Sequence, residues 1–178
     1  MNLIKLFLMV MMSVGAESSI YGLKTVWKDQ NNQSKVLNDF SGKPTLITMV
    51  YTSCAHTCPM TISKVEEIKR SLEKAGLKDF RLVLASFDDV VDKPDHLKAY
   101  MLKRKLDPSV WTFLSPVSQK ESREMSVLLG ISFKKLGESE YSHSNVITLL
   151  DKKGVPVAKI DNLSADISTF EEAVKKLK

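Results

Sequence analysis

Uninterrupted apolar runs alternate along this chain with segments whose apolar residues recur at helical spacing. These runs predict two buried strands, at 45–51 and 81–87, and a short strand at 111–114. Between the first two, apolar residues recur every three or four positions over 62–75 while basic and acidic residues face away, which predicts an amphipathic helix. Pro59 suits the first position of this helix, because a missing N–H leaves nothing unpaired there, and Gly76 is a typical stop.

The second half of the chain continues this alternation and then changes to a hairpin. Three helices are predicted here, from Pro94 to about Lys105, from a capping box at 118–121 to Gly130, and from 168 to the C-terminus. Strands at 146–150 and 155–160 flank an Asp-Lys-Lys-Gly sequence, which is a good hairpin signal. A strand-like opening at 23–27 precedes all of these elements.

This order of elements predicts the fold class. Strands that alternate with helices, followed by a hairpin and a terminal helix, predict an α/β fold with a central mixed β-sheet flanked by helices. We find no repeat and no linker rich in Pro, Gly or Ser, so we expect one domain. Sites in such sheets form at the carboxyl ends of strands. Cys54 and Asp88 both lie just past predicted strand ends.

The first sixteen residues have the pattern of an export signal. A short, weakly basic start precedes an apolar core at 6–14, and Val14-Gly15-Ala16 offers small residues at the usual cleavage spacing. The apolar stretch is shorter than the roughly 20 residues that a membrane span needs. We therefore expect a signal peptide at residues 1–16, a single domain at 17–178, and a periplasmic or otherwise exported protein. The alternative is an uncleaved segment that anchors the protein to a membrane.

Charge changes this picture little. The formal net charge is +5, and the lysines are spread along the chain among acidic residues. No basic stripe is interleaved with aromatic residues, so nucleic-acid binding is not expected. A charge of this size is compatible with docking to an acidic partner but does not argue for one.

Cys54 and Cys58 are the only cysteines, and they follow the strand at 45–51 directly. If this turn winds like a helix, the i,i+4 spacing stacks the two side chains roughly 5–6 Å apart on one face. The pair then has two uses, to share one soft metal ion or to form a disulfide. Exported proteins favour structural disulfides, but a bridge across three residues constrains little of the unfolded chain. Cys58 is expected at the helix N-cap, where the free N–H groups and the helix dipole stabilise a thiolate.

The three histidines differ as candidate ligands. His143 stands just before the strand at 146–150, from where it could face the cysteine turn, although a lone loop histidine is often unremarkable. His56 lies between the cysteines and is either a ligand, a group that tunes a thiol, or a solvent-facing residue. His96 is expected at the surface. Two sulfurs and one imidazole suit Cu(I), whereas a closed structural zinc site needs four protein ligands.

Several motifs together resemble the Sco/SenC family of copper-binding assembly proteins. They are Asp-Phe-Ser-Gly-Lys-Pro at 39–44, Tyr-Thr-x-Cys-x-x-x-Cys-Pro at 51–59, Ser-Phe-Asp at 86–88, and His143-Ser144 before a Leu-Asp-x-x-Gly turn at 150–154. The resemblance covers roughly residues 37–160. The chain departs from the family pattern at Ala55, Asp89 and Ser142, where the family often has Pro, Pro and Asp.

The resemblance implies a thioredoxin-like fold and one copper ion, as Cu(I) or Cu(II), bound by Cys54, Cys58 and His143, with the two cysteines also able to form a disulfide. It further implies a role in maturing the dicopper centre of cytochrome c oxidase, by copper delivery, by reduction of the target's cysteines, or both. The expected partners are the apo copper-site subunit of a respiratory oxidase or a similar cuproprotein, a thiol reductase and another copper donor.

Two functions therefore compete. The first is a copper chaperone without turnover of a small substrate. The second is a thiol–disulfide oxidoreductase in which Cys54, expected to be the more exposed, attacks a partner and Cys58 resolves the mixed disulfide. Thioredoxin-type enzymes more often separate their cysteines by two residues, which favours the chaperone here. A peroxiredoxin-type peroxidase fits poorly, because Ile47 and Tyr51 occupy its required Pro and Thr positions.

Overall fold

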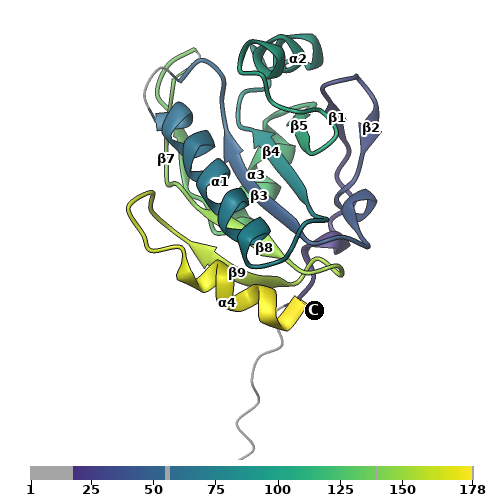
Figure 1. Ribbon diagram of the computed structural model, residues 1–178. Helices are drawn as coiled ribbons and strands as arrows, with labels where there is room; N and C mark the ends of the chain where they lie inside the picture. Colours follow the sequence, from purple (N-terminus) through teal and green to yellow (C-terminus); the bar gives the residue numbers. More distant parts are fainter. Residues whose placement is uncertain (1–17, 55–56, 139, 178) are drawn as a thin grey trace, which may run out of the picture.

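A seven-stranded mixed sheet forms the centre of the protein (Figure 1). The computed structural model describes residues 18–54, 57–138 and 140–177. The expected signal peptide at 1–16 and the side chain of His56 therefore lie outside the described residues. The strands follow one another in the sheet in the order β2 (Ser34–Lys35), β1 (Trp27–Asp29), β5 (Trp111–Ser115), β4 (Arg81–Ser86), β3 (Thr45–Val50), β8 (Ile147–Leu150) and β9 (Pro156–Ile160).

The three middle strands set the position of the site. β3 pairs with β4 and β4 with β5 in parallel, while β1, β8 and β9 join antiparallel. Val50 lies opposite Ser86 at the carboxyl ends of β3 and β4. The segments that carry Cys54 and Asp88 therefore leave the sheet at the same edge, as the sequence predicts.

Helices cover both faces of this sheet. α1 and α4 pack against each other in front of the sheet, α3 lies behind it, and α2 packs against β5 (Figure 1). Their bounds are α1 (Thr57–Lys74), α2 (Pro94–Lys103), α3 (Gln119–Leu129) and α4 (Ser168–Leu177), with short 3-10 helices at Ile20–Gly22 and Leu37–Phe40. The mixed α/β fold is thus confirmed. The predicted capping box of α3 is present at Ser118 and Glu121, and Gly130 ends the helix with a φ of 66°.

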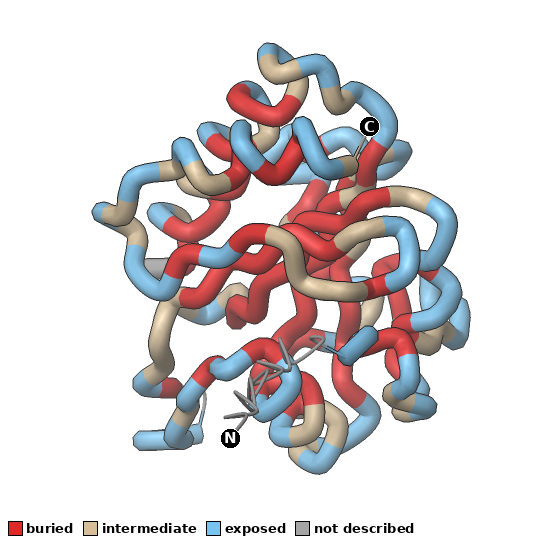
Figure 2. Tube along the Cα trace, turned by 90° about the horizontal axis from the view of Figure 1, so that it is seen from below, coloured by how far each residue is buried: buried red, intermediate tan, exposed pale blue. Residues whose placement is uncertain are grey.

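Burial follows the sheet. Figure 2 shows the buried residues running through the middle of the molecule, with exposed residues around the outside. β3 is buried at all six positions because layers cover both of its faces, which is why it reads as an uninterrupted apolar run. Trp27, Phe113 and Phe170 are among the largest fully buried side chains and join the first strand, the sheet centre and α4 in one core.

Three local predictions differ from the structure. The opening strand is β1 at Trp27–Asp29 and not 23–27, and α1 begins at Thr57, two residues before Pro59. A second, two-stranded sheet of β6 (Phe133–Lys135) and β7 (Tyr141–His143) was not predicted. These two strands are short and largely exposed, so they lack the apolar run that identifies a buried strand.

Candidate functional site

The two cysteines are held by the turn between β3 and α1. The N–H of Cys54 donates to the carbonyl of Tyr51 at 3.4 Å. The N–H of Cys58 then donates to Sγ of Cys54 at 3.4 Å, and the N–H of Tyr51 donates to Sγ of Cys58 at 3.5 Å. Each sulfur therefore accepts a backbone N–H of this turn: that of Cys54 from the start of α1, and that of Cys58 from the residue after β3. The sequence prediction that the two thiols lie close together is consistent with these contacts.

The two thiols have different surroundings. Cys54 is half-buried, whereas Cys58 is 1% exposed, so the expected greater exposure of Cys54 is confirmed. The expectation that Cys58 occupies the N-cap and has a stabilised thiolate is wrong. Cys58 is the second residue of α1, and burial raises the pKa of its thiol more than the N–H of Tyr51 lowers it. Its sulfur is therefore held as a thiol in the metal-free protein.

His143 is the last residue of β7 and is not in a loop. Its ring packs against the rings of Phe87 and Tyr51, with centroid distances of 5.0 and 5.9 Å. Nδ1 lies 3.0 Å from the carbonyl of Ser144. Because a carbonyl oxygen only accepts, Nδ1 carries the proton and Nε2 keeps a lone pair. Burial lowers the pKa of His143, so the ring is neutral at neutral pH, the form in which imidazole binds metals.

Tyr51 lies between the thiols and the imidazole. Its ring meets that of His143 edge-on, at an interplanar angle of 81°. Its hydroxyl donates to the carbonyl of Tyr141 at 3.2 Å. Burial, together with a hydrogen bond to Cys54, raises the pKa of Tyr51 to about 12, so the phenol stays protonated. Tyr51 was noted in the sequence only as part of the motif, and its role as the common neighbour of all three candidate ligands was not predicted.

A further contact holds the segment after His143 against α1. The hydroxyl of Thr61, one turn into that helix, lies 3.3 Å from Oδ1 of Asn145.

The three candidate ligands do not form a ready-made metal site. Within the described parts of the chain, no group of three or more His, Cys, Asp or Glu side chains is arranged to hold a metal ion. The structure brings the two free cysteines into one turn and places the ring of His143 against Tyr51 beside them.

The buried carboxylate of Asp92 is hydrogen-bonded to the turn that carries the cysteines. Asp92 is fully buried and accepts hydrogen bonds from the N–H of Thr52 at 3.0 Å, from the hydroxyl of Thr52, and from the hydroxyl of Ser86 at 2.5 Å. Burial raises the pKa of Asp92, and the hydrogen bonds from Ser86 and Thr52 oppose that shift. This residue ties the turn to the end of β4. No role for Asp92 was predicted from the sequence, and the nearest signal was the Ser-Phe-Asp motif at 86–88, whose Ser86 donates to it.

The burial of Asp88 and the exposure of Met60 are both the opposite of what is usual for their residue types. Asp88 is fully buried, and its Oδ1 accepts the N–H groups of Val90 and Val91 at 2.9 and 3.0 Å. It therefore shapes the loop after β4. Met60, early in α1, is apolar, yet its side chain is 60% exposed beside the cysteine turn. His96 is exposed, as predicted.

The family is shown by sequence comparison. The SCO1/SenC family profile matches residues 24–178. The chain belongs to the SCO1/SenC family. A candidate copper-binding protein of Stutzerimonas stutzeri is 26% identical over 131 residues, which cover 71% of this chain and 62% of the relative. The matched region thus spans less than two thirds of that relative.

Solved structures of SCO1/SenC proteins share the fold. A SCO1/SenC family lipoprotein from Bacillus anthracis is 23% identical with a TM-score of 0.75, over 85% of this chain and 91% of that one. ScoI from Bradyrhizobium japonicum, solved with copper bound, is 25% identical with a TM-score of 0.68, over 86% and 97%. BsSco, a Sco-family cytochrome c oxidase assembly protein with a disulfide switch, is 23% identical with a TM-score of 0.69, over 86% and 92%. The fold is therefore the thioredoxin-like fold of Sco proteins.

No helix within residues 18–54, 57–138 and 140–177 is long and apolar enough to cross a membrane.

Proposed function

We propose that this protein is a copper chaperone that binds one copper ion through Cys54, Cys58 and His143. Membership of the SCO1/SenC family supports copper as the cargo, because ScoI of Bradyrhizobium japonicum has been solved with copper bound. The donor set is chemically suited to it, since thiolates and imidazole are the ligands that soft Cu(I) prefers. The assignment of these three residues follows the family motifs, and the packing of the His143 ring against Tyr51, beside the two cysteines, supports it.

The observation that carries the proposal is the position of Tyr51. This residue contacts all three candidate ligands: its N–H donates to Cys58, its hydroxyl is hydrogen-bonded to Cys54, and its ring packs on His143. A neutral imidazole with its Nδ1 proton on the carbonyl of Ser144 presents Nε2 as the donor atom. Capture of the ion by all three ligands requires the imidazole and the thiols to come closer together, because the described residues do not already form a three-ligand group.

Each ligand has a separate part in the exchange. Cys54 is the half-buried thiol that an incoming ligand reaches first, and Cys58 is the buried sulfur at the base of the turn. Loading displaces their protons, because thiolates are the metal-binding form. A three-coordinate ion leaves one position for a ligand of the receiving protein, so the cargo passes by ligand exchange without being released to solvent.

The receiving protein and the compartment are part of the same proposal. BsSco belongs to a family of cytochrome c oxidase assembly proteins, which supports the apo copper-site subunit of a respiratory oxidase, or a similar cuproprotein, as the recipient. A SCO1/SenC lipoprotein among the structural neighbours supports an exported location. We propose that residues 1–16 direct export, that 17–178 form the single working domain, and that a thiol reductase and a copper donor serve it.

Anaerobic titration with Cu(I) tests the ligand set. The reduced parent protein should bind one Cu(I), and His143→Ala should weaken binding by about tenfold or more, because a metal held by two sulfurs alone loses its third donor. His96→Ala is the matched control, since it removes an exposed imidazole from α2 and should bind like the parent. If His143→Ala binds Cu(I) and Cu(II) as tightly as the parent, the three-ligand site is wrong.

A thiol–disulfide oxidoreductase is the second candidate, and one observation favours it. The exposed attacking thiol and the buried resolving thiol of such enzymes match the difference in burial between Cys54 and Cys58. A reductase assay on the same His143→Ala variant also distinguishes the oxidoreductase from the copper chaperone. Brisk metal-free reduction of a disulfide substrate that survives His143→Ala supports the enzyme, whereas negligible turnover without copper supports the chaperone.

A further inference from the structure

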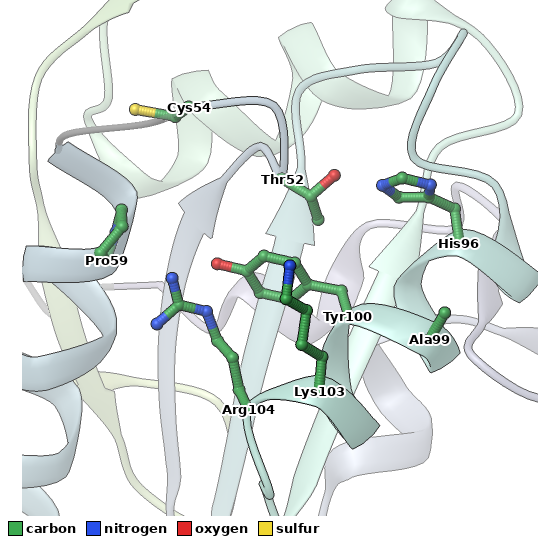
Figure 3. A pocket seen from close by; sticks show the side chains of 8 residues that line it. All are labelled: Thr52, Cys54, Pro59, His96, Ala99, Tyr100, Lys103 and Arg104. Carbon is green, nitrogen blue, oxygen red and sulfur yellow. The ribbon is translucent and has the colours of Figure 1, made fainter.

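A groove opens beside Cys54, between the start of α1 and one face of α2. Its volume is about 550 Å³, which falls within the roughly 300–1,000 Å³ typical of ligand-binding sites. Cys54 and Pro59 lie on one side, and Tyr100, Lys103 and Arg104 lie on the other (Figure 3). Whatever occupies this groove is therefore next to the more exposed of the two thiols.

The ionisable groups of this groove other than the cysteine and tyrosine are all basic. Lys103, Arg104 and His96 line it and are exposed, and no carboxylate is among its lining residues. Within the part of the chain that the structure describes, neither Lys103 nor Arg104 forms an ion pair with an acidic side chain. The groove thus presents two cations that no acid of the described residues neutralises at close range.

The guanidinium of Arg104 is already positioned. It stacks over the ring of Tyr100 at 4.9 Å, and Tyr100 in turn packs edge-on against the buried Phe113, with ring centroids 6.0 Å apart. A cation held in this way loses less freedom on binding than a side chain that moves freely in solvent.

A second hollow continues the groove along α1. It has a volume of about 630 Å³ and shares Pro59 and Arg104 with the first. Its lining includes Lys64, Arg70 and Glu67, but Glu67 is paired with Lys64 at 3.1 Å. Arg70 has no ion-pair partner among the described residues. The basic character therefore extends beyond the end of α2, where cations would also be explained by the helix dipole.

An exposed apolar side chain lines the second hollow. It is Met60, which is 60% exposed. Arginine, tyrosine and methionine are enriched in protein–protein interfaces. An elongated surface with cations in two connected hollows fits an extended peptide segment better than a single free anion, which needs only one cluster of donors.

We propose that these two hollows dock an acidic segment of the protein that exchanges with the cysteine pair, and that docking brings a thiol of this segment to Cys54. This identification of the partner's chemistry rests on the proposed function. The partner is a protein with carboxylates on either side of a cysteine. Arg104, Lys103 and Arg70 bind the carboxylates, and Met60 supplies apolar contact beside the site of exchange.

Thiol–disulfide exchange with charged peptides tests the docking surface. The probes are short peptides with one cysteine, flanked by glutamates or by glutamines, each supplied as the mixed disulfide with 5-thio-2-nitrobenzoate. In a Cys58→Ser background, the Cys54 thiolate attacks the sulfur of the peptide cysteine, the disulfide bond breaks, and the coloured thiolate leaves. The glutamate peptide should react about tenfold faster at low ionic strength, and sodium chloride should reduce this advantage.

Two double variants locate the effect. Lys103→Gln/Arg104→Gln should remove most of the preference for the glutamate peptide. Lys98→Gln/Lys152→Gln removes the same formal charge from exposed positions outside both hollows and should keep the preference. Equal losses in the two double variants would overturn the proposal, because the preference would then come from net charge alone.

Two further measurements separate other outcomes. If sodium sulfate removes the preference far more effectively than sodium chloride of equal ionic strength, a free anion occupies the groove and the peptide is the wrong occupant. Cu(I) titration of Lys103→Gln/Arg104→Gln should match the parent. A parent that selects the glutamate peptide but binds no Cu(I) would leave the docking surface standing and overturn the chaperone function. A parent that binds Cu(I) but shows no preference for the glutamate peptide would overturn the docking surface and leave the chaperone function standing.

Discussion

The two ends of β3 differ in how firmly their surroundings are fixed. At the amino end, the hydroxyl of Tyr21 lies 3.2 Å from both the carbonyl of Phe40 and Oγ1 of Thr45, and its ring fills the space above Gly154. At the carboxyl end, two sulfurs accept backbone N–H groups at 3.4 and 3.5 Å. The amino end is thus closed by ring packing and hydrogen bonds to oxygen, whereas the candidate thiol ligands are held by the weaker hydrogen bonds that sulfur accepts.

The largest expected effect is at the closed end. Gly154 has a φ of 83°, and a Cβ added there would lie 2.5 Å from the ring of Tyr21. Gly154→Ala should lower the free energy of unfolding by about 2–4 kcal/mol, because it combines left-handed backbone strain with a clash in a packed region. Urea denaturation followed by circular dichroism measures this loss.

Gly42→Ala is the matched control for that variant. Gly42 has a similar φ of 88°, but no atom of the described residues outside its chain neighbours lies within 4 Å of a Cβ added there. It should cost only the backbone strain, about 1–2 kcal/mol. Equal losses for Gly42→Ala and Gly154→Ala would contradict the claim that the amino end of β3 is closed by the Tyr21 ring.

A smaller loss of stability is expected when the hydroxyl of one tyrosine at either end of β3 is removed. Tyr51→Phe removes the hydroxyl that donates to Tyr141 and should cost about 0.5–1.5 kcal/mol. Tyr21→Phe should cost more, because both neighbours of the Tyr21 hydroxyl are oxygens of buried residues, Phe40 and Thr45. The second neighbour of the Tyr51 hydroxyl is instead the weaker, half-buried sulfur of Cys54. Thermal and urea unfolding of the two variants under the same conditions provide the comparison, and a larger loss for Tyr51→Phe would reverse the assignment of the rigid end.

The smallest expected effect is a pH-dependent change in the free energy of unfolding that comes from Asp92. Burial raises the pKa of this carboxyl group in the folded protein, so the native state binds its proton more tightly than the unfolded chain does. The associated stability is present at low pH and is lost as pH rises from the ordinary aspartate pKa, about 3.9, through the raised value. Asp92→Asn should therefore gain stability relative to the parent as pH rises through this window.

Urea midpoints measured across acidic pH check this sign. Asp95→Asn is the control, because Asp95 is exposed in the first turn of α2 and does not contact the cysteine turn. If the difference between the parent and Asp92→Asn stays constant across the window, or falls as pH rises, burial does not dominate the titration of Asp92.

The sequence predicted the parts of this molecule that depend on long periodic patterns. β3 and β4 were clear because they are buried on both faces, and α3 because its capping box and Gly130 mark both ends. The hairpin that carries His143 was missed, because its strands have three residues each and little apolar character. The placement of Cys58 at the N-cap failed because α1 begins at Thr57, before the proline that suggested the boundary.

The candidate site was predicted only as a set of residue types. The spacing of Cys54 and Cys58 predicted two neighbouring thiols, and family motifs pointed to His143. The burial that raises the pKa of Cys58 and the position of Tyr51 depend on the packing of β7 and the loop after β4 against the turn. Contacts between segments that are 90 residues apart in the chain produce no local sequence pattern, so the sequence could not predict them.

The division into two sheets has a consequence for cargo binding. His143 belongs to the two-stranded sheet, where it pairs with Phe133, and both cysteines follow a strand of the seven-stranded sheet. The imidazole and the sulfurs thus have separately hydrogen-bonded supports. An ion held by all three would bridge the two sheets, next to the hydrogen bond from the hydroxyl of Tyr51 to the carbonyl of Tyr141 and the packing of their rings, which already join them.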